Sequence, residues 1–202
     1  MPTFDPADLS PDATYHLLSA LVVPRPIAWV GSIGRDGVAN LAPHSFFNVV
    51  SNDPPIVHFT SSGTKDTLTN IRAHPEFTVS LVTSDLLAAM NTTAVAAPPG
   101  EDEFALAGLE PAESVTVAPP RVAASPAALE CTVRTVLSMG SGHMVFGDVT
   151  HLHVDDAVWR DGRVDHEVLA PVGRLSGSRY AMPGTIRELK RPSWADLEAG
   201  TS

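Results

Sequence analysis

The pattern of apolar and polar positions along the chain predicts short β-strands separated by turns. An apolar run over residues 27–33 ends at the turn Gly34-Arg35-Asp36-Gly37. A second run begins at Val38 and resumes over residues 45–50. Because an Asp-Gly turn between two apolar runs is a strong hairpin signal, we expect these runs to form adjacent antiparallel strands. Further strands are expected at residues 56–60, 77–82, 128–137 and 144–154, with a second Asp-Gly turn inside residues 159–164.

Helical patterns are fewer and short. Ser10 and Pro11 suit the N-cap and first turn of a helix that continues to about Leu21. Two more helices are expected at residues 65–73 and 85–90, and the chain ends in a weakly helical stretch. Residues 94–126 are rich in Pro, Ala and Glu, and we interpret them as one structured insertion, because Phe104, Leu106 and Leu109 weaken the alternative of a disordered linker.

The balance of elements favours a mainly β fold, a β-barrel with short helices, over a doubly wound sheet. The sequence contains neither the Gly-rich fingerprint of a dinucleotide-binding βαβ unit nor a phosphate loop of the nucleoside triphosphatase type. A nicotinamide, if the protein uses one, is therefore held in another way.

The net charge and the cysteine count limit the ligands and the cellular compartment that we expect. The formal net charge of −10 argues against a nucleic-acid partner, and an anionic ligand would need local cations or helix amides. Cys131 is the single cysteine, so no intrachain disulfide forms and a reducing compartment is expected. Without a leader pattern or an apolar run of about 20 residues, we expect a cytoplasmic protein and no membrane partner.

A hydroxyl-rich segment at residues 60–67 is the strongest candidate for chemistry. A strand leads into Ser61, Ser62 and Thr64, and then a helix begins at Lys65. Helix N-terminal amides and a lysine suit an anion. The alternative is an ordinary helix cap made by Thr64.

Two other segments carry candidate binding groups. Residues 40–48 place Asn and Ser side chains beside Phe46 and Phe47, which suits a flat heterocycle with hydrogen-bonding edges. The alternative is that both phenylalanines are core residues. Arg25 lies between Pro24 and Pro26, and it either points at a ligand or forms a salt bridge in a rigid loop.

The remaining reactive side chains favour structural roles. His151 and His153 share one face of a strand, but the sequence places no third ligand beside them, so no metal site is expected. His58, His143 and Cys131 are interpreted as structural residues.

Several of these segments together resemble a known family. Residues 23–30, 40–48, 53–55 and 65–71 are similar, in this order, to flavin reductase-like FMN-binding proteins. That family includes flavoredoxin and the reductase components of two-component flavin monooxygenases. The resemblance continues through residues 102–104, 120–122, 129–131, 145–149 and 174–175.

The resemblance implies an FMN-binding split barrel of Greek-key-like order, usually a homodimer with the flavin near the subunit interface. It covers residues 1–202 as a single domain, with a core of about 15–180 and a C-terminal extension over 181–202. The hydroxyl segment would hold the phosphate, and Ser45 to Asn48 would lie along the isoalloxazine ring. The implied flavin-binding residues are Ser32, Ser45, Phe46, Phe47, Asn48, Ser61, Ser62, Thr64, Lys65, Asp66 and Thr67, with Arg25, His44, Arg174 and Tyr180 as further candidates.

The resemblance also implies an activity. NAD(P)H would reduce FMN by hydride transfer, and the reduced flavin or its electrons would pass to a partner monooxygenase or another acceptor. The alternative is a non-enzymatic FMN electron carrier of the flavoredoxin type. No catalytic side chain is singled out, because the flavin performs the chemistry. His44 stands where the family frequently has phenylalanine, and Ser32 where threonine is commoner.

Overall fold

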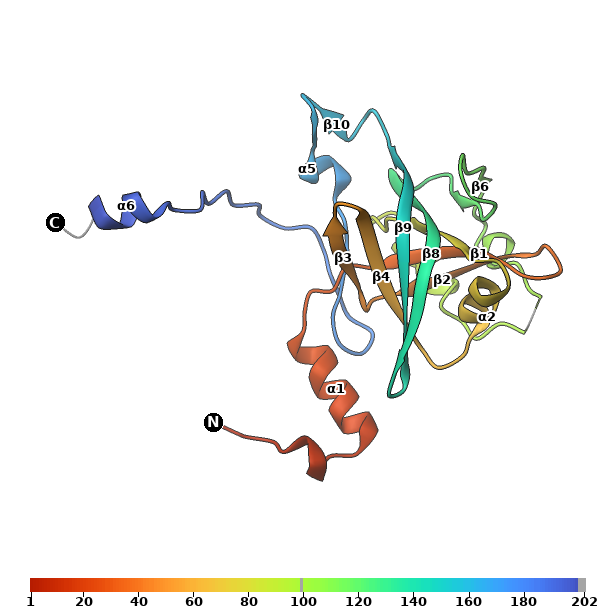
Figure 1. The fold of residues 1–202 in the computed structure, drawn as a ribbon, viewed down its shortest axis with the longest axis horizontal. Helices are drawn as coiled ribbons and strands as arrows, with labels where there is room; N and C mark the ends of the chain where they lie inside the picture. The colour runs from red at the N-terminus through yellow and green to blue at the C-terminus, as the bar shows by residue number, and fades with distance from the viewer. Residues whose placement is uncertain (99, 200–202) are drawn as a thin grey trace.

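The computed structural model describes residues 1–98 and 100–199. At its centre is a seven-stranded antiparallel sheet (Figure 1). In spatial order its strands are β2 (Ala39–His44), β1 (Ala28–Ile33), β5 (Glu76–Ser80), β8 (Ala127–Met139), β9 (Gly142–Val154), β4 (Pro55–Ser62) and β3 (Phe47–Asn52). Three two-stranded pieces are β6 (Pro111–Ala112) with β7 (Arg121–Val122), β10 (Trp159–Arg160) with β11 (Arg163–Val164), and β12 (Gly173–Arg174) with β13 (Tyr180–Ala181).

The helices are short, as the sequence predicts. They are α1 (Pro11–Leu21), α2 (Asp66–Ala73), α3 (Leu87–Thr92), α4 (Glu103–Leu106), α5 (His166–Leu169) and α6 (Trp194–Ala199), preceded by the 3-10 turn η1 (Pro6–Asp8). Ser10 caps α1 by accepting a hydrogen bond from the amide of Ala13. No helix in the described part of the chain is long and apolar enough to cross a membrane.

The predicted hairpin is confirmed. β1 and β2 are antiparallel neighbours, with Ser32 opposite Asn40. In the turn between them, Gly37 has a φ of 82°, a left-handed conformation that glycine adopts without a steric penalty. The Asp36 carboxylate also accepts from the amide of Val38 at 3.1 Å. The local turn chemistry therefore sets this register.

The continuation of the second strand was predicted wrongly. Instead of one interrupted strand, residues 39–52 form two strands with different partners: β2 pairs with β1, and β3 pairs with β4. The chain changes partner at Ser45 and Phe46, where the amide of Thr60 already donates to the Phe46 carbonyl. Both halves have the same β-like composition, so only the tertiary fold distinguishes them.

Two apolar cores lie on the two faces of the sheet. One contains Phe59 and Phe77, whose ring centroids are 5.3 Å apart in an edge-to-face contact, and it buries Leu68 of α2. The other surrounds Trp29, whose indole N–H donates to the Thr93 hydroxyl at 2.9 Å. Phe104 packs in this second core. This supports the interpretation of residues 94–126 as a structured insertion, although Leu106 is exposed.

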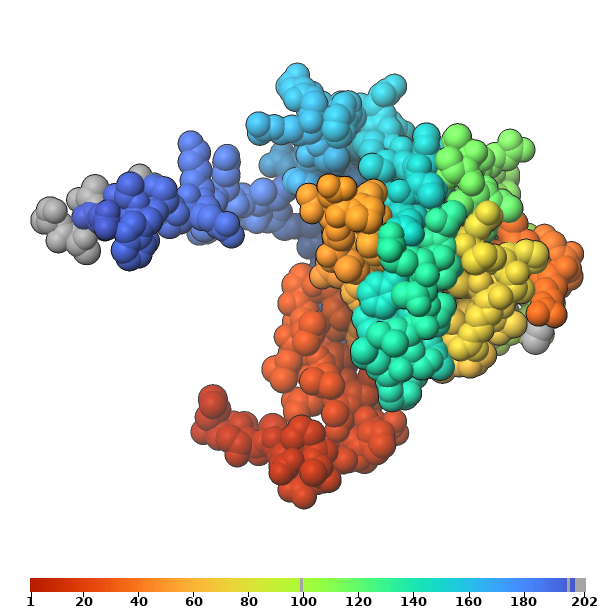
Figure 2. Space-filling view, viewed as in Figure 1, coloured from red at the N-terminus to blue at the C-terminus, as the bar shows by residue number. Residues whose placement is uncertain are grey.

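Two segments extend away from the sheet. Figure 2 shows the N-terminal segment with α1 and the C-terminal arm (residues 182–199) projecting separately, with an open space between them. The arm carries large apolar side chains into solvent: Leu189 is 90% exposed and Trp194 is 74% exposed. Apolar side chains are therefore exposed on the arm, whereas they are buried in the two cores.

The close packing of β9 against the core gives a stability prediction. A Cβ added at Gly147 would overlap Cζ and Cε1 of Phe77 and lie 3.1 Å from Cβ of Cys131. Gly147→Ala should therefore lower the free energy of unfolding by about 1–3 kcal/mol, the usual cost of overpacking a core. Urea unfolding followed by circular dichroism measures it. Gly184→Ala is the matched control, because a Cβ there meets nothing within 4 Å, and equal stability of the two variants would contradict the prediction.

Candidate functional site

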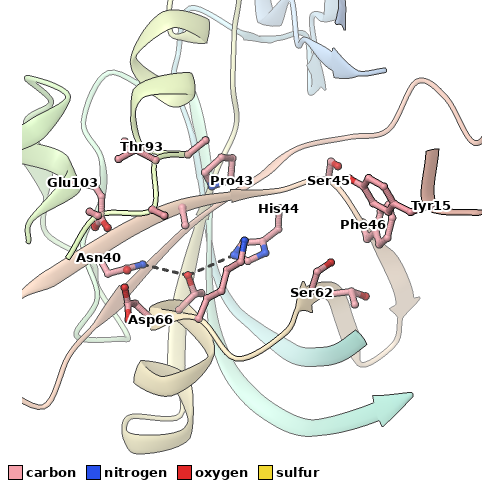
Figure 3. Close-up of a pocket in the computed structure, with 18 residues that line it drawn as sticks. Tyr15, Asn40, Pro43, His44, Ser45, Phe46, Ser62, Asp66, Thr93 and Glu103 are labelled. Atoms are coloured by element: carbon pink, nitrogen blue, oxygen red, sulfur yellow. Dashed lines mark hydrogen bonds between the residues drawn. The ribbon is translucent and has the colours of Figure 1, made fainter. Parts of the chain in front are cut away.

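A polar cavity of about 350 Å³ lies where β2 ends, β4 ends and α2 begins (Figure 3). Residues 93–97 and Glu103 of α4 form part of its wall. Its lining combines hydroxyl, amide, imidazole, ammonium and carboxylate groups. The lining residues are Tyr15, Asn40, Ala42, Pro43, His44, Ser45, Phe46, Thr60, Ser62, Lys65, Asp66, Thr67, Thr93, Ala94, Val95, Ala96, Ala97 and Glu103.

The N-terminus of α2 opens toward this cavity without a side-chain cap. Lys65 is the N-cap residue and makes no side-chain capping hydrogen bond, so the alternative of a Thr64 cap is wrong. By contrast, Asp102 caps α4 and Asp165 caps α5. The first-turn amides of α2, with about half a positive charge at the helix terminus, can therefore donate to an anion beside the Lys65 ammonium.

A hydrogen-bonded chain crosses the floor of the cavity. The amide Nδ2 of Asn40 donates to Oγ1 of Thr67 at 3.2 Å, and Nε2 of His44 lies 3.5 Å from the same oxygen (Figure 3). The Thr67 side chain is buried, and its hydroxyl joins β2 to the first turn of α2. His44 occupies the middle of the cavity, and its ring centroid is 4.7 Å from that of Phe59.

His44 is neutral at neutral pH. Burial and then the charge of Lys65 lower the pKa of the imidazole to about 4, against an opposing hydrogen bond with the Thr60 backbone. A neutral ring can accept the Thr67 hydroxyl proton at Nε2. The floor of the cavity therefore presents a neutral imidazole next to a lysine.

The carboxylates of Asp66 and Glu103 lie on one side of the cavity, and Ser45 and Ser62 lie on the other (Figure 3). Burial raises the pKa of Glu103, and the charges of Asp66 and Asp102 act in the same direction, while a hydrogen bond from the amide of Leu41 lowers it. Oε2 of Glu103 accepts that hydrogen bond at 3.0 Å. An anion is therefore favoured on the side of the cavity where Ser62 lies, away from these two carboxylates.

Arg25 forms no salt bridge with any residue that the structure describes, so that alternative is wrong. Its guanidinium is buried and donates to the carbonyls of Ser19, Val22 and Leu175. Its Nε also donates to Oγ of Ser45 at 3.3 Å. The side chain lies outside the polar cavity and fixes the corner between β2 and β3 that supplies His44, Ser45 and Phe46.

The cavity gathers some of the predicted flavin-binding residues and not others. Ser45, Phe46, Ser62, Lys65, Asp66, Thr67 and His44 line it. Ser32 is buried and accepts from Asn70, and Ser61 is buried and donates to the carbonyl of Gly63. Thr64, Phe47, Asn48, Arg174 and Tyr180 also lie outside its lining. The roles of all these residues toward a ligand stay predictions.

The C-terminal candidates contact their own chain. The Arg174 guanidinium lies 4.6 Å from the Tyr180 ring centroid, and the Tyr180 hydroxyl donates to Oδ1 of Asn91 at 3.3 Å. The structure places them in the β12–β13 pair, and the chain extends outward after Ala181.

The sequence did not predict the cavity residues that come from segments far along the chain from residues 40–67. Tyr15 comes from α1, and its ring is 6.4 Å from that of Phe46. Residues 94–97 and Glu103 come from the insertion, and Thr93 immediately precedes it. The Asp102 cap marks the start of α4 in the sequence, but nothing local shows that Glu103 turns toward Leu41.

The paired histidines on β9 have a structural partner. His151 and His153 share a face, with ring centroids 4.8 Å apart. Nε2 of His153 lies 2.6 Å from Oε1 of the fully buried Glu130. Burial opposes ionisation of Glu130, but hydrogen bonds with His153, Thr116 and the amides of residues 115 and 116 lower its pKa to about 2. Within the described residues, no group of three or more His, Cys, Asp or Glu side chains is arranged to hold a metal ion.

Comparison with known proteins identifies the class. The family model described as the flavin reductase like domain matches residues 19–166, and the chain belongs to this family. An uncharacterised protein of Deinococcus radiodurans is 43% identical over 208 residues, covering 96% of this chain and 92% of that protein.

Solved structures agree on the fold. Nitrilotriacetate monooxygenase component B from Bacillus cereus is similar to this chain at 34% identity with a TM-score of 0.90, covering 94% of this chain and 98% of that one. A Shewanella frigidimarina structure named for its split barrel domain matches with a TM-score of 0.85 at 20% identity, covering 95% of this chain and 100% of that one. The seven-stranded sheet is thus a split barrel of the flavin reductase-like family.

Proposed function

We propose that this protein is an NAD(P)H-dependent flavin reductase that binds FMN in the polar cavity and supplies reduced flavin or electrons to a partner monooxygenase. The bound flavin would supply the chemistry by accepting a hydride from the nicotinamide. The protein would position the flavin and exclude water. The similarity to a monooxygenase component B supports the partner, and a reducing cytoplasmic location suits the single buried Cys131.

The observation that carries the proposal is the uncapped N-terminus of α2 beside Lys65. The donor groups there fit a phosphate monoester: an ammonium, the Ser62 hydroxyl and first-turn amides. In a chain of net charge −10, no general positive field attracts the ligand, so these local donors would hold it. Ser45 and Phe46, which also line the cavity, would contact the flavin ring.

We also propose that the working unit is a homodimer. A second, apolar cavity of about 740 Å³ lies beside β3, β4 and β9, and Ala181 and Met182 line it where the arm leaves the barrel. Its lining includes Val49 and Leu152, which are 67% and 64% exposed. A second copy of the chain would cover these side chains and fill the space between α1 and the arm that Figure 2 shows.

The proposed activity is tested with purified protein and a visible spectrum before and after FMN is added. Steady-state NADH and NADPH oxidation with FMN is then measured. Turnover supports the reductase. Tight flavin binding without turnover would instead support the electron carrier of the flavoredoxin type, and the absence of flavin binding would overturn both.

Lys65→Ala should weaken FMN binding by about 10- to 150-fold, because a charge-assisted hydrogen bond contributes roughly 1.5–3 kcal/mol and each 1.4 kcal/mol is a factor of ten. Riboflavin, which lacks the phosphate, should bind wild type and variant equally. Fluorescence quenching measures both affinities. Arg72→Ala is the matched control, since it removes an exposed cation at the other end of the same helix. Unchanged FMN affinity in folded Lys65→Ala would contradict the assignment of Lys65.

Leu152→Glu should weaken dimerisation by at least about tenfold, because an unpaired charge would be buried at the interface. Light scattering across a concentration series measures the dimer dissociation constant. Leu106→Glu is the matched control, because Leu106 is also exposed and lies on α4, outside the apolar cavity. A monomeric wild type at micromolar concentration with flavin bound would contradict the dimer.

A further inference from the structure

His44 is the histidine in the lining of the polar cavity, so its protonation state affects the charge that a ligand there would meet. The titratable and polar groups that share the cavity with it come from four elements. Lys65 and Asp66 lie at the start of α2, Glu103 at the start of α4, Tyr15 on α1, and the Thr60 backbone on β4. Of these, Lys65 is the charge that opposes protonation of the ring.

The Thr67 hydroxyl joins His44 to Asn40 and to the first turn of α2. Oγ1 of Thr67 accepts from Asn40, so its single proton is available to Nε2 of the neutral His44. If the ring gains a proton at Nε2, it must donate to Oγ1 instead of accepting. The Thr67 hydroxyl then directs its own proton elsewhere, and a phosphate oxygen in the same cavity is an acceptor. Protonation of His44 thus adds a cation and also releases a hydroxyl donor.

A phosphate would reverse the electrostatics around the ring. Lys65 opposes protonation of His44 in the protein by itself, whereas a phosphate monoester beside Lys65 would bring nearly two negative charges. An anion close to an imidazole favours its charged form.

We propose that His44 is a specificity-determining residue of this cavity: the imidazole takes up a proton when a phosphate monoester binds beside Lys65, and it thereby selects FMN over dephosphorylated flavin. This inference rests on the proposed binding of FMN in the polar cavity. Phenylalanine at this position would keep the ring contact with Phe59 and lose the proton.

The sign of the pH dependence follows from linkage. A group whose pKa rises on ligand binding makes binding stronger as the pH falls through the pKa of the complex. The pKa of His44 starts at about 4 in the protein alone. If it returns in the complex to the ordinary histidine value of about 6.5, FMN affinity gains about tenfold between about pH 8 and about pH 5.5.

The test compares wild type with His44→Phe, using FMN and riboflavin as probes at about pH 8 and about pH 5.5. The ratio of FMN affinities, wild type over variant, should rise about tenfold on acidification. Titration of the FMN phosphate itself cancels in this ratio, because the free ligand is common to both proteins. Riboflavin should show the same pH dependence with both proteins. His44→Gln, polar but without a titrating proton in this range, should behave like His44→Phe.

Isothermal titration calorimetry in two buffers of different ionisation enthalpy gives a second readout. At about pH 6, FMN binding should take up more protons in wild type than in His44→Phe, by about half a proton or more. An FMN affinity ratio that is independent of pH, or equal proton uptake by the two proteins, would overturn the role of His44 while FMN binding stands. A wild type that binds neither flavin would overturn the proposed function and this inference together.

Discussion

The buried guanidinium of Arg25 is the interaction on which the arrangement of this molecule depends. Within the described residues it has no carboxylate partner, and it donates to the carbonyls of Ser19 and Val22 at the C-terminal end of α1, to the carbonyl of Leu175, and to the Ser45 hydroxyl. A cation at a helix C-terminus is favoured by the helix dipole. Pro24 and Pro26 restrict the backbone on either side of it. One side chain therefore holds α1, the C-terminal segment and the β2–β3 corner together.

That corner determines which residues reach the polar cavity. Because β2 pairs with β1 and β3 pairs with β4, the chain between them crosses from one edge of the sheet to the other. His44 and Ser45 lie at the crossing, next to the end of β4 and the start of α2. The ligand-facing groups thus come from segments that are adjacent only after the sheet has formed.

Two buried carboxylates fasten the insertion to this sheet. Glu103 reaches from α4 to the amide of Leu41 on β2. Glu130 on β8 accepts from the amides of Val115 and Thr116 at 2.7 and 2.6 Å. Each carboxylate is satisfied by backbone donors, which offsets part of the cost of burying it. Residues 94–126 have little regular structure of their own, and these contacts explain why they can form a wall of the cavity.

The sequence by itself determined the elements whose signals are local. The Asp36-Gly37 turn set the β1–β2 hairpin, and Ser10 and Pro11 set the start of α1. Residues 23–30, 40–48, 53–55 and 65–71 together indicated the family. Only the tertiary structure decided the change of partner at Ser45, the burial of Ser61 and the position of Glu103. The physical reason is that strand propensity and side-chain chemistry are the same on both sides of that corner. Which strand a segment pairs with, and whether a hydroxyl faces a core or a cavity, depends on contacts between residues far apart in the chain, and such contacts leave no local pattern.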